Sequence, residues 1–417
     1  MPDAALAPGS AEPATLWVVA IFAVVYLGMF LGGLPRLKLD RCGVALLGCI
    51  AIVGSGALST EAAARAVHLP TVLLLFAFMV ISAQMRLGGF YTALTRYIVA
   101  LPIRENALLG ALIALAGGLS AVFSNDIVCL AMTPVIARLC VERQLNPASF
   151  LIGLACAANI GSAATLIGNP QNMLIGAVLH LSFGDYVVRA LPPVVLSLLA
   201  LWAWLIWVPP PQIKLPTHPG DSENPPDFDR LQSAKGLSVA FALLLVFLLT
   251  DWPRELAALL GAGVLLLSRR FHSSHVMGFV DWELLVLFIG LFVVNHAFEQ
   301  TGLAADAVAW AAAHDFHLGD SSSLLLVGSV LSNLVSNVPA VMLLLPHISG
   351  SQAGSLLALV STFAGNLLLI GSIANLIVAD LALRQGIEIG WRQHLRIGLP
   401  VSALSLGIAM LCNGLPA

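Results

Sequence analysis

Charged residues are scarce in this sequence: Asp, Glu, Lys and Arg together make up 10% of its 417 residues. A soluble domain carries roughly 25%. A chain with so little charge cannot cover a water-facing surface, so the sequence excludes an ordinary soluble protein and predicts that lipid is its solvent. The few charges nearly cancel, to a formal net charge of −3, which argues against nucleic acid as a partner.

Motifs for catalysis and nucleotide hydrolysis are also missing from the sequence. It contains no P-loop motif, which argues against a fused ATPase domain, although a separate ATPase subunit stays open. It contains no catalytic triad, metal-ligand cluster or cofactor motif, so we expect neither an enzyme nor a bound cofactor. The six cysteines lie in apolar stretches without CxxC spacing and are expected to pack as small apolar side chains. Cys129 and Cys156 lie near polar segments where trivalent arsenic could use thiols.

Apolar runs, in contrast, are abundant and long. A helix needs about 20 apolar residues to cross roughly 30 Å of hydrocarbon, whereas a transmembrane barrel would show shorter segments of alternating polarity. The sequence therefore predicts an all-α membrane protein. Its main apolar runs are Leu16–Leu34, Val44–Leu58, Val72–Met85, Val194–Val208, Leu237–Thr250, Leu256–Leu267, Leu284–Val294 and Val401–Leu411.

The basic residues predict how the chain is threaded, because Lys and Arg accumulate in cytoplasmic loops. With both termini outside the inner (cytoplasmic) membrane, 16 of the 19 basic residues fall inside and only Arg65, Arg189 and Arg254 fall outside. This arrangement requires residues 106–139 and 321–347 each to enter and leave on one side. Both segments are too short for two full spans at about 1.5 Å per residue. We therefore expect about ten membrane crossings and two re-entrant helical hairpins.

The two halves of the sequence can be aligned with one another at polar and glycine positions. Because the basic residues place equivalent loops on opposite sides of the membrane, the alignment predicts an inverted repeat of the kind found in secondary transporters. The first repeat is residues 1–208, a cytoplasmic linker follows at 209–235, and the second repeat is residues 236–417. The matched positions are Arg41–Gly48 with Arg254–Gly261, Gly89 with Gly302, Ser124–Asn125 with Ser336–Asn337, Pro134 with Pro346, and Leu166–Gly168 with Leu369–Gly371.

Four polar segments, two in each half, interrupt the apolar runs and define the candidate site. Residues 120–126 and 332–339 are the hairpin turns, and residues 159–172 and 365–375 break long spans. Irregular backbone at membrane depth is tolerated only where it lines a cavity or is buried in protein. Freed carbonyls can hold a cation, and half-helix N-termini attract an anion or a polar oxygen; helix packing is the alternative role. The predicted substrate- and ion-binding residues are Ser120, Ser124, Asn125, Asp126, Gly168, Asn169, Asn172, Ser332, Ser336, Asn337, Gly371, Ser372 and Asn375.

These motifs resemble those of the ion transporter superfamily, and the resemblance covers nearly the whole chain. The Ser-Asn pairs at both hairpin turns and the Gly-Asn-Pro-Gln-Asn break at residues 168–172 carry it. Within the superfamily the chain is most similar to the arsenite permease and NhaD-type branch, with a citrate transporter-like domain. The related dicarboxylate–sodium symporters have Ser-Asn-Thr at both hairpin tips, where Ser and Asn help hold sodium. This chain has Asp126 and Val338 in place of the threonines, which counts against dicarboxylate recognition and a two-sodium scheme. The resemblance also implies a homodimer through scaffold spans.

Asp126 at the first hairpin turn decides the functional prediction. An ionised Asp at mid-bilayer costs about 2.5–3.5 kcal/mol on insertion scales, and desolvation favours the neutral acid, which suits a proton carrier. Capping of the second hairpin arm is an alternative role. No Lys or Arg lies within the four segments, so a neutral or monoanionic substrate, or a cation, fits better than a dianion.

We therefore predict a secondary transporter that exports a small oxyacid such as arsenite or antimonite, is coupled to protons through Asp126, and works by alternating access. The alternatives are a sodium-coupled transporter of an anion, such as a dicarboxylate, citrate or an inorganic anion, and a sodium/proton antiporter. Residues 89–104 and 302–316 alternate apolar and polar positions and predict interfacial helices that link scaffold to hairpin. Gln84, near the end of one span, is expected to have a packing role, and Asn295, toward the outer end of another, to make interfacial or scaffold contacts.

Overall fold

The computed structural model describes residues 11–34, 37–208, 211, 213, 228–268 and 270–413, with side chains from residue 15 onward. Within these residues the chain is almost entirely helical, which confirms the predicted all-α membrane fold. One short antiparallel strand pair, β1 (Gly33–Leu34) and β2 (Leu39–Asp40), is found in the same described ranges. The helices are α1 (Ala11–Leu31), α2 (Arg41–Gly54), α3 (Thr60–Ala66), α4 (Leu69–Leu87), α5 (Phe90–Val99), α6 (Glu105–Val122), α7 (Asn125–Glu142), η1 (Ala148–Ile152), α8 (Gly153–Ser162), α9 (Pro170–Val178), α10 (Phe183–Trp207), α11 (Arg230–Leu249), α12 (Arg254–Leu266), α13 (Ser273–Met277), α14 (Trp282–Glu299), α15 (Leu303–Ala313), α16 (Ser321–Val335), α17 (Asn337–Leu344), η2 (Leu345–His347), α18 (Ser351–Ala364), η3 (Leu369–Gly371), α19 (Ile373–Arg384) and α20 (Trp391–Asn413).

Six of the described helices are long and apolar enough to cross a membrane by length and composition: α4, α6, α10, α11, α14 and α20. Helices α2 and α12, which lie in two other predicted spans, have 14 and 13 residues. The two interrupted spans, α8–α9 and α18–α19, are divided into half-helices that are each too short to cross alone. The count of ten crossings therefore stays a prediction.

The hairpins and breaks occur at the polar segments that the sequence singles out. Helix α6 ends at Val122 and α7 begins at Asn125, and in the second half α16 ends at Val335 and α17 begins at Asn337. The first break separates α8 from α9, and the second separates α18 from α19. At the first break Asn169 caps the start of α9, and at the second Gly365 follows the end of α18. At the two hairpin turns the N-cap residues are Ser124 and Ser336.

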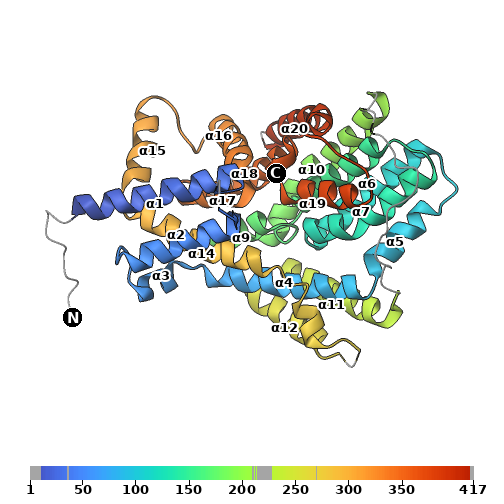
Figure 1. The fold of residues 1–417 in the computed structure, drawn as a ribbon, viewed down its shortest axis with the longest axis horizontal. Helices are drawn as coiled ribbons and strands as arrows, with labels where there is room; N and C mark the ends of the chain where they lie inside the picture. Colours follow the sequence, from blue (N-terminus) through green and yellow to red (C-terminus); the bar gives the residue numbers. More distant parts are fainter. Residues whose placement is uncertain are drawn as a thin grey trace.

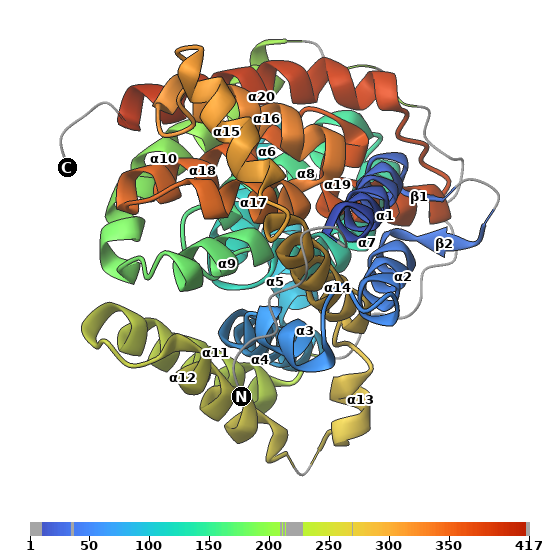
Figure 2. The same ribbon diagram turned by 90° about the vertical axis from the view of Figure 1, so that its left-hand side faces the viewer.

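The helices pack in two groups (Figure 1). In the scaffold group, which we define as α1, α2, α4, α11, α12 and α14, α2 packs against α14 and α12 packs against α4. In the hairpin group, defined as α6–α10 and α16–α20, α6 packs against α8 and α16 against α18. Two further contacts join the halves of the chain inside this group: α7 of the first hairpin packs against α19, and α17 of the second packs against α9. In Figure 2, α11 and α12 lie at the lower edge of the molecule, below α9 and α10.

Helices α5 and α15 connect the scaffold group to the two hairpins. Gly89 and Gly302 directly precede these helices and have φ angles of +66° and +78°. This left-handed conformation is freely available to glycine and costly for most other residues. The two matched glycines of the sequence alignment therefore make the same turn, one in each half of the chain.

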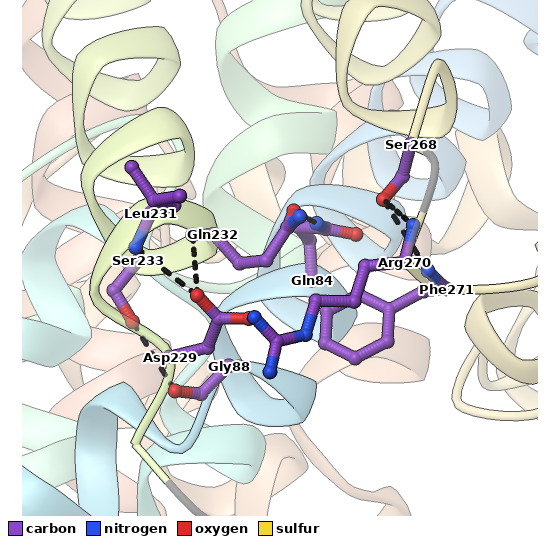
Figure 3. A network of polar contacts seen from close by, with 9 residues as sticks. All are labelled: Gln84, Gly88, Asp229, Leu231, Gln232, Ser233, Ser268, Arg270 and Phe271. Atoms are coloured by element: carbon purple, nitrogen blue, oxygen red, sulfur yellow. Dashed lines mark hydrogen bonds and ion pairs between the residues drawn. The ribbon is translucent and has the colours of Figure 1, made fainter.

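A polar network joins α4, the start of α11 and the α12–α13 loop (Figure 3). Asp229 caps α11 and also forms an ion pair of 2.9 Å with Arg270. Its backbone N–H donates to the carbonyl of Gly88 at 3.0 Å, and Gln84 donates to Gln232 at 2.6 Å. Gln84 thus joins α4 to α11 within the described residues. Since α11 begins at residue 230, the last six residues of the predicted linker 209–235 are helical; residues 214–227 of that linker lie outside the described residues.

Candidate functional site

The first broken span contacts the first hairpin arm backbone to backbone. A Cβ atom added to Gly161 would lie 2.3 Å from the backbone of Gly117. One added to Gly168 would lie 2.2 Å from the carbonyl oxygen of Ser162 and 2.6 Å from that of Ser120. No side chain fits in such spaces without a backbone shift. Gly168, predicted as a site residue, therefore serves this close approach.

The start of α9, just after the first break, is satisfied by its own side chains. Asn169 stands at the N-cap position and accepts a hydrogen bond from the backbone N–H of Asn172 at 2.9 Å, a cap that satisfies a free donor of the first turn. Asn169 also donates to Ser162 at 2.9 Å, and Asn172 donates to the hydroxyl of Tyr186 at 3.0 Å. The donor groups of both predicted ligand residues are thus engaged by the protein itself.

The second break is held by Asn375, whose amide nitrogen donates to the carbonyls of Gly365 at 2.9 Å and Leu368 at 3.1 Å. These carbonyls belong to backbone that the break releases from helical bonding. Ser372 occupies the N-cap position of α19 but does not cap its own helix. Its hydroxyl donates instead to Asn159 Oδ1 at 3.0 Å. The second break is therefore linked by a side chain to the first half of the chain.

Asn159 joins the two halves of the hairpin group. Its amide nitrogen donates to Asn366 Oδ1 at 2.8 Å and to Asn375 Oδ1 at 3.2 Å. Its amide oxygen accepts from Asn125 Nδ2 at 3.0 Å and from Ser372 as described. An asparagine amide has two N–H donors and an oxygen with two lone pairs, so these four bonds use its whole capacity. We call Asn125, Asn159, Asn366, Ser372 and Asn375 the amide cluster.

Each hairpin turn places an asparagine against the glycine of one break. The backbone N–H of Asn125 donates to the Gly168 carbonyl at 3.3 Å. With the oxygen and nitrogen of its side-chain amide placed so that each faces a suitable partner, Asn337 donates to the Gly371 carbonyl at 3.3 Å and to the Ser361 carbonyl at 3.0 Å. Ser336, before Asn337, has a φ of +77°, a conformation that costs energy for a residue with a side chain.

Several buried polar atoms around these turns have no hydrogen-bond partner among the described residues. They include one acceptor in the amide cluster, Asn125 Oδ1, and one donor, Asn366 Nδ2. The hydroxyls of Ser120 and Ser332 and the amide oxygen of Asn333 also have no hydrogen-bond partner among the described residues. An unsatisfied buried polar group costs about 1–3 kcal/mol. The set contains donors, acceptors and hydroxyls that can do either, and it carries no formal charge.

Asp126 lies in the first turn of α7, outside the amide cluster. Within the described part of the chain its carboxylate makes no hydrogen bond or ion pair, and α7 has no side-chain cap. The capping role considered for Asp126 is therefore not seen. Ser124, at the N-cap position, is half-buried and likewise does not cap the helix.

Two members of the amide cluster, Asn159 and Asn366, are absent from the predicted site residues. Both lie inside the polar segments 159–172 and 365–375, so the signal for them was present in the sequence. Thr362 was also missed: it accepts from Gln171 at 3.1 Å and from Asn169 at 3.3 Å. It lies three residues before the second break, one helical turn from residues that the pattern marked.

Comparison with known proteins places this arrangement in a family. The model of the family described as "CitMHS: Citrate transporter" matches residues 17–364. The rice silicon efflux transporter LSI3 is 26% identical, over 97% of this chain and 97% of the relative. A putative transporter arsB from Dictyostelium discoideum is 23% identical, over 90% of this chain and 87% of the relative.

A solved structure shares the fold of the chain. The YdaH transporter of Alcanivorax borkumensis is similar with a TM-score of 0.58 and 16% identity, covering 96% of this chain and 97% of that one. Identity at this level speaks for the fold alone, and the fold it supports is that of a multi-pass membrane transporter. The family match over residues 17–364 shows that the chain is a secondary transporter. The chain belongs to the CitMHS citrate transporter family of the ion transporter superfamily.

Proposed function

We propose that this protein exports a small, uncharged oxyacid such as arsenite or antimonite, that export is coupled to protons through Asp126, and that the hairpin group moves against the scaffold group in alternating access. The substrate site is formed by the two hairpin turns and the two breaks, around the amide cluster. The coupling residue stands beside it at the start of α7.

The observation that carries the proposal is the chemistry of the unpaired atoms. A neutral oxyacid offers hydroxyl groups that both donate and accept, so it can satisfy Asn125 Oδ1, Asn366 Nδ2 and a serine hydroxyl at the same time. An ionised carboxylate group offers acceptors only and would leave the amide oxygens unpaired. Arsenous acid is largely neutral at pH 7, which suits a cluster without a cationic side chain.

Two of the relatives support this class of substrate. One is named a silicon efflux transporter and another a putative arsB transporter. Arsenous and silicic acids are both small hydroxylated acids that are mostly uncharged near neutral pH. Their shared feature is a compact set of hydroxyl groups, which matches mixed amide and hydroxyl partners.

Citrate is the second candidate, because the family description names it. A citrate trianion needs cationic or numerous N–H partners to replace its hydration. The amide cluster has a single unpaired amide nitrogen, that of Asn366, within the described residues. Sodium bound together with citrate would supply positive charge, so a sodium requirement is the sign that would favour this alternative.

The test is transport in proteoliposomes under an imposed pH gradient or an imposed sodium gradient, with arsenite and citrate fluxes and internal pH recorded. We expect arsenite to move against the proton gradient without sodium. In Asp126→Asn the side chain cannot exchange a proton, and proton-driven arsenite flux should fall at least tenfold. Asp306→Asn is the matched control, since Asp306 is exposed on α15 and should leave flux unchanged.

Three outcomes would contradict the proposal. Sodium-dependent citrate flux with inert arsenite would favour the citrate alternative. Coupled exchange of sodium and protons without any oxyacid would favour a sodium/proton antiporter. Undiminished proton coupling in Asp126→Asn would exclude Asp126 as the proton carrier even if arsenite is the substrate.

A further inference from the structure

Arg254 connects the scaffold group to the half-helix that follows the first break. It is the first residue of α12, and its guanidinium reaches the C-terminal end of α9. The Nη2 atom donates to the carbonyl of Gly176 at 3.0 Å and to the carbonyl of Leu181 at 2.7 Å. The Gly176 carbonyl also accepts from the backbone N–H of Leu181 at 3.1 Å, and Leu181 lies in the turn that follows α9. The C-terminal end of a helix is the negative end of its dipole, so a cation there is favourable.

The contact depends on the residue opposite the arginine. A Cβ atom added to Gly176 would lie 3.1 Å from Arg254 Nη1, so glycine at this position lets the guanidinium approach the end of α9 closely. Arg254 is half-buried and forms no ion pair within the described residues. The hydrogen bonds to the end of α9 and to the turn after it are therefore its main attachment among the described residues.

A cavity of about 760 Å³ lies beside this contact. His180 in the α9–α10 turn and Asp185 in the first turn of α10 line it from the hairpin group. Asp251 in the α11–α12 turn and Arg254 at the start of α12 line it from the scaffold group, and His68 before α4 completes the wall. The two groups are thus in polar contact at Arg254 and separated by open space next to it. Such a space gives the α9–α10 turn room to shift relative to α12 once the arginine releases it.

We propose that Arg254 is a conformational latch: its two hydrogen bonds hold the end of α9 against the scaffold group in the state seen here, and they must break when the hairpin group moves. Arg254 is a positioning residue that acts through α9 on the first break and Asn169, and it does not contact substrate. The inference rests on the proposed alternating access, but it does not depend on which solute is carried.

The test measures the conformation directly. Spin labels on Asp251→Cys and Gly184→Cys, in a protein whose native cysteines are replaced, report the distance between the α11–α12 turn and the start of α10 by pulsed electron paramagnetic resonance. Asp251 is exposed, and a Cβ atom at Gly184 meets nothing within 4 Å, so both positions accept a label. In Arg254→Gln we expect the ratio of the original distance population to all others to fall at least fivefold. Arg254→Lys, which keeps the charge but has one terminal nitrogen, should give an intermediate ratio.

Arg41→Gln is the matched control. Arg41 is the first residue of α2, is half-buried, and donates to the Met29 carbonyl at 3.2 Å, but both ends of that bond lie in the scaffold group. The spin-label distance distribution of Arg41→Gln should equal that of the labelled parent. An unchanged distribution in Arg254→Gln, with thermal unfolding at the parent temperature, would overturn the latch. If Arg254→Gln fails to fold, the Arg254→Lys distribution decides: no shift there would also overturn it. Absence of arsenite transport in the parent protein, together with a shifted distribution in Arg254→Gln, would leave the latch intact and contradict the proposed substrate.

Discussion

The two broken spans satisfy their backbone in opposite ways, although the sequence presents them as copies. In the first, Asn169 caps α9 directly, and its further contact with the second half, to Thr362, is made in addition to this cap. In the second, Ser372 occupies the equivalent N-cap position but leaves its own helix uncapped and bonds Asn159 in the other half. A repeated motif therefore does not impose a repeated role, because a short polar side chain at a helix start can serve its own helix or a distant partner.

This difference suggests that the two breaks have different roles, one mainly in stability and the other mainly in transport. A self-capped break is stabilised locally and should keep its geometry while the molecule moves. A break tied through Asn159 depends on a side-chain contact between residues 213 positions apart, so its order is coupled to the other half of the chain. We expect substitutions at the first break to affect stability most and those at the second to affect transport most.

Asn159→Ala should have the largest effect, because it removes the link between the breaks. It leaves Asn125, Asn366, Asn375 and Ser372 each without one hydrogen bond. With about 1 kcal/mol per lost hydrogen bond, unfolding free energy should fall by about 4 kcal/mol, and transport should be lost. The measurement is denaturant unfolding in detergent together with arsenite flux.

Asn146→Ala controls for the loss of an asparagine as such. Asn146 is half-buried and bonds the Pro211 carbonyl and the Ala148 N–H near the start of η1, away from both breaks. It should cost much less stability and leave transport near the parent rate. Equal losses in Asn146→Ala and Asn159→Ala would mean that the amide cluster has no special role.

Glycine substitutions should separate the two breaks next. In Gly168→Ala the new methyl group would lie 2.2 Å and 2.6 Å from two backbone carbonyl oxygens, whereas in Gly371→Ala its nearest neighbours are Asn333 Oδ1 at 3.0 Å and the Gly365 carbonyl at 3.1 Å. Backbone atoms at the first site must shift, so we expect Gly168→Ala to cost about 3 kcal/mol, at the upper end for overpacking, and Gly371→Ala about 1 kcal/mol.

Gly118→Ala on α6 is the control for this pair, since a methyl group there meets nothing within 4 Å. It should be neutral or slightly stabilising, because alanine favours a helix interior. Thermal unfolding of the three variants side by side is sufficient. A larger loss in Gly371→Ala than in Gly168→Ala would reverse the assignment of the tighter break.

The sequence predicts the positions of these breaks but not their bonding. Apolar runs and the spacing of Gly, Pro and Asn place the helices and turns, because they reflect local preferences and the thickness of a membrane. Asn159 lies in a segment that the sequence marks, but its bonds to Asn366 and Asn375, 207 and 216 residues away, cannot be predicted from the order of residues along the chain. Asn169 and Asn172 were marked as ligands because an asparagine that caps a helix and one that binds a solute look alike in sequence.

Small effects should come from the two N-cap positions themselves. They test most directly whether the first break acts mainly in stability and the second mainly in transport. Asn169→Ala removes a cap together with the contact to Ser162, so unfolding free energy should fall by about 1–2 kcal/mol. Ser372→Ala removes one bond to an amide that keeps its partner Asn125, and about 0.6 kcal/mol is typical of such bonds in membrane proteins. We nevertheless expect Ser372→Ala to slow arsenite transport more than Asn169→Ala, because it loosens the link between the halves. If transport loss simply follows stability loss in this pair, the second break is no more coupled to the cycle than the first.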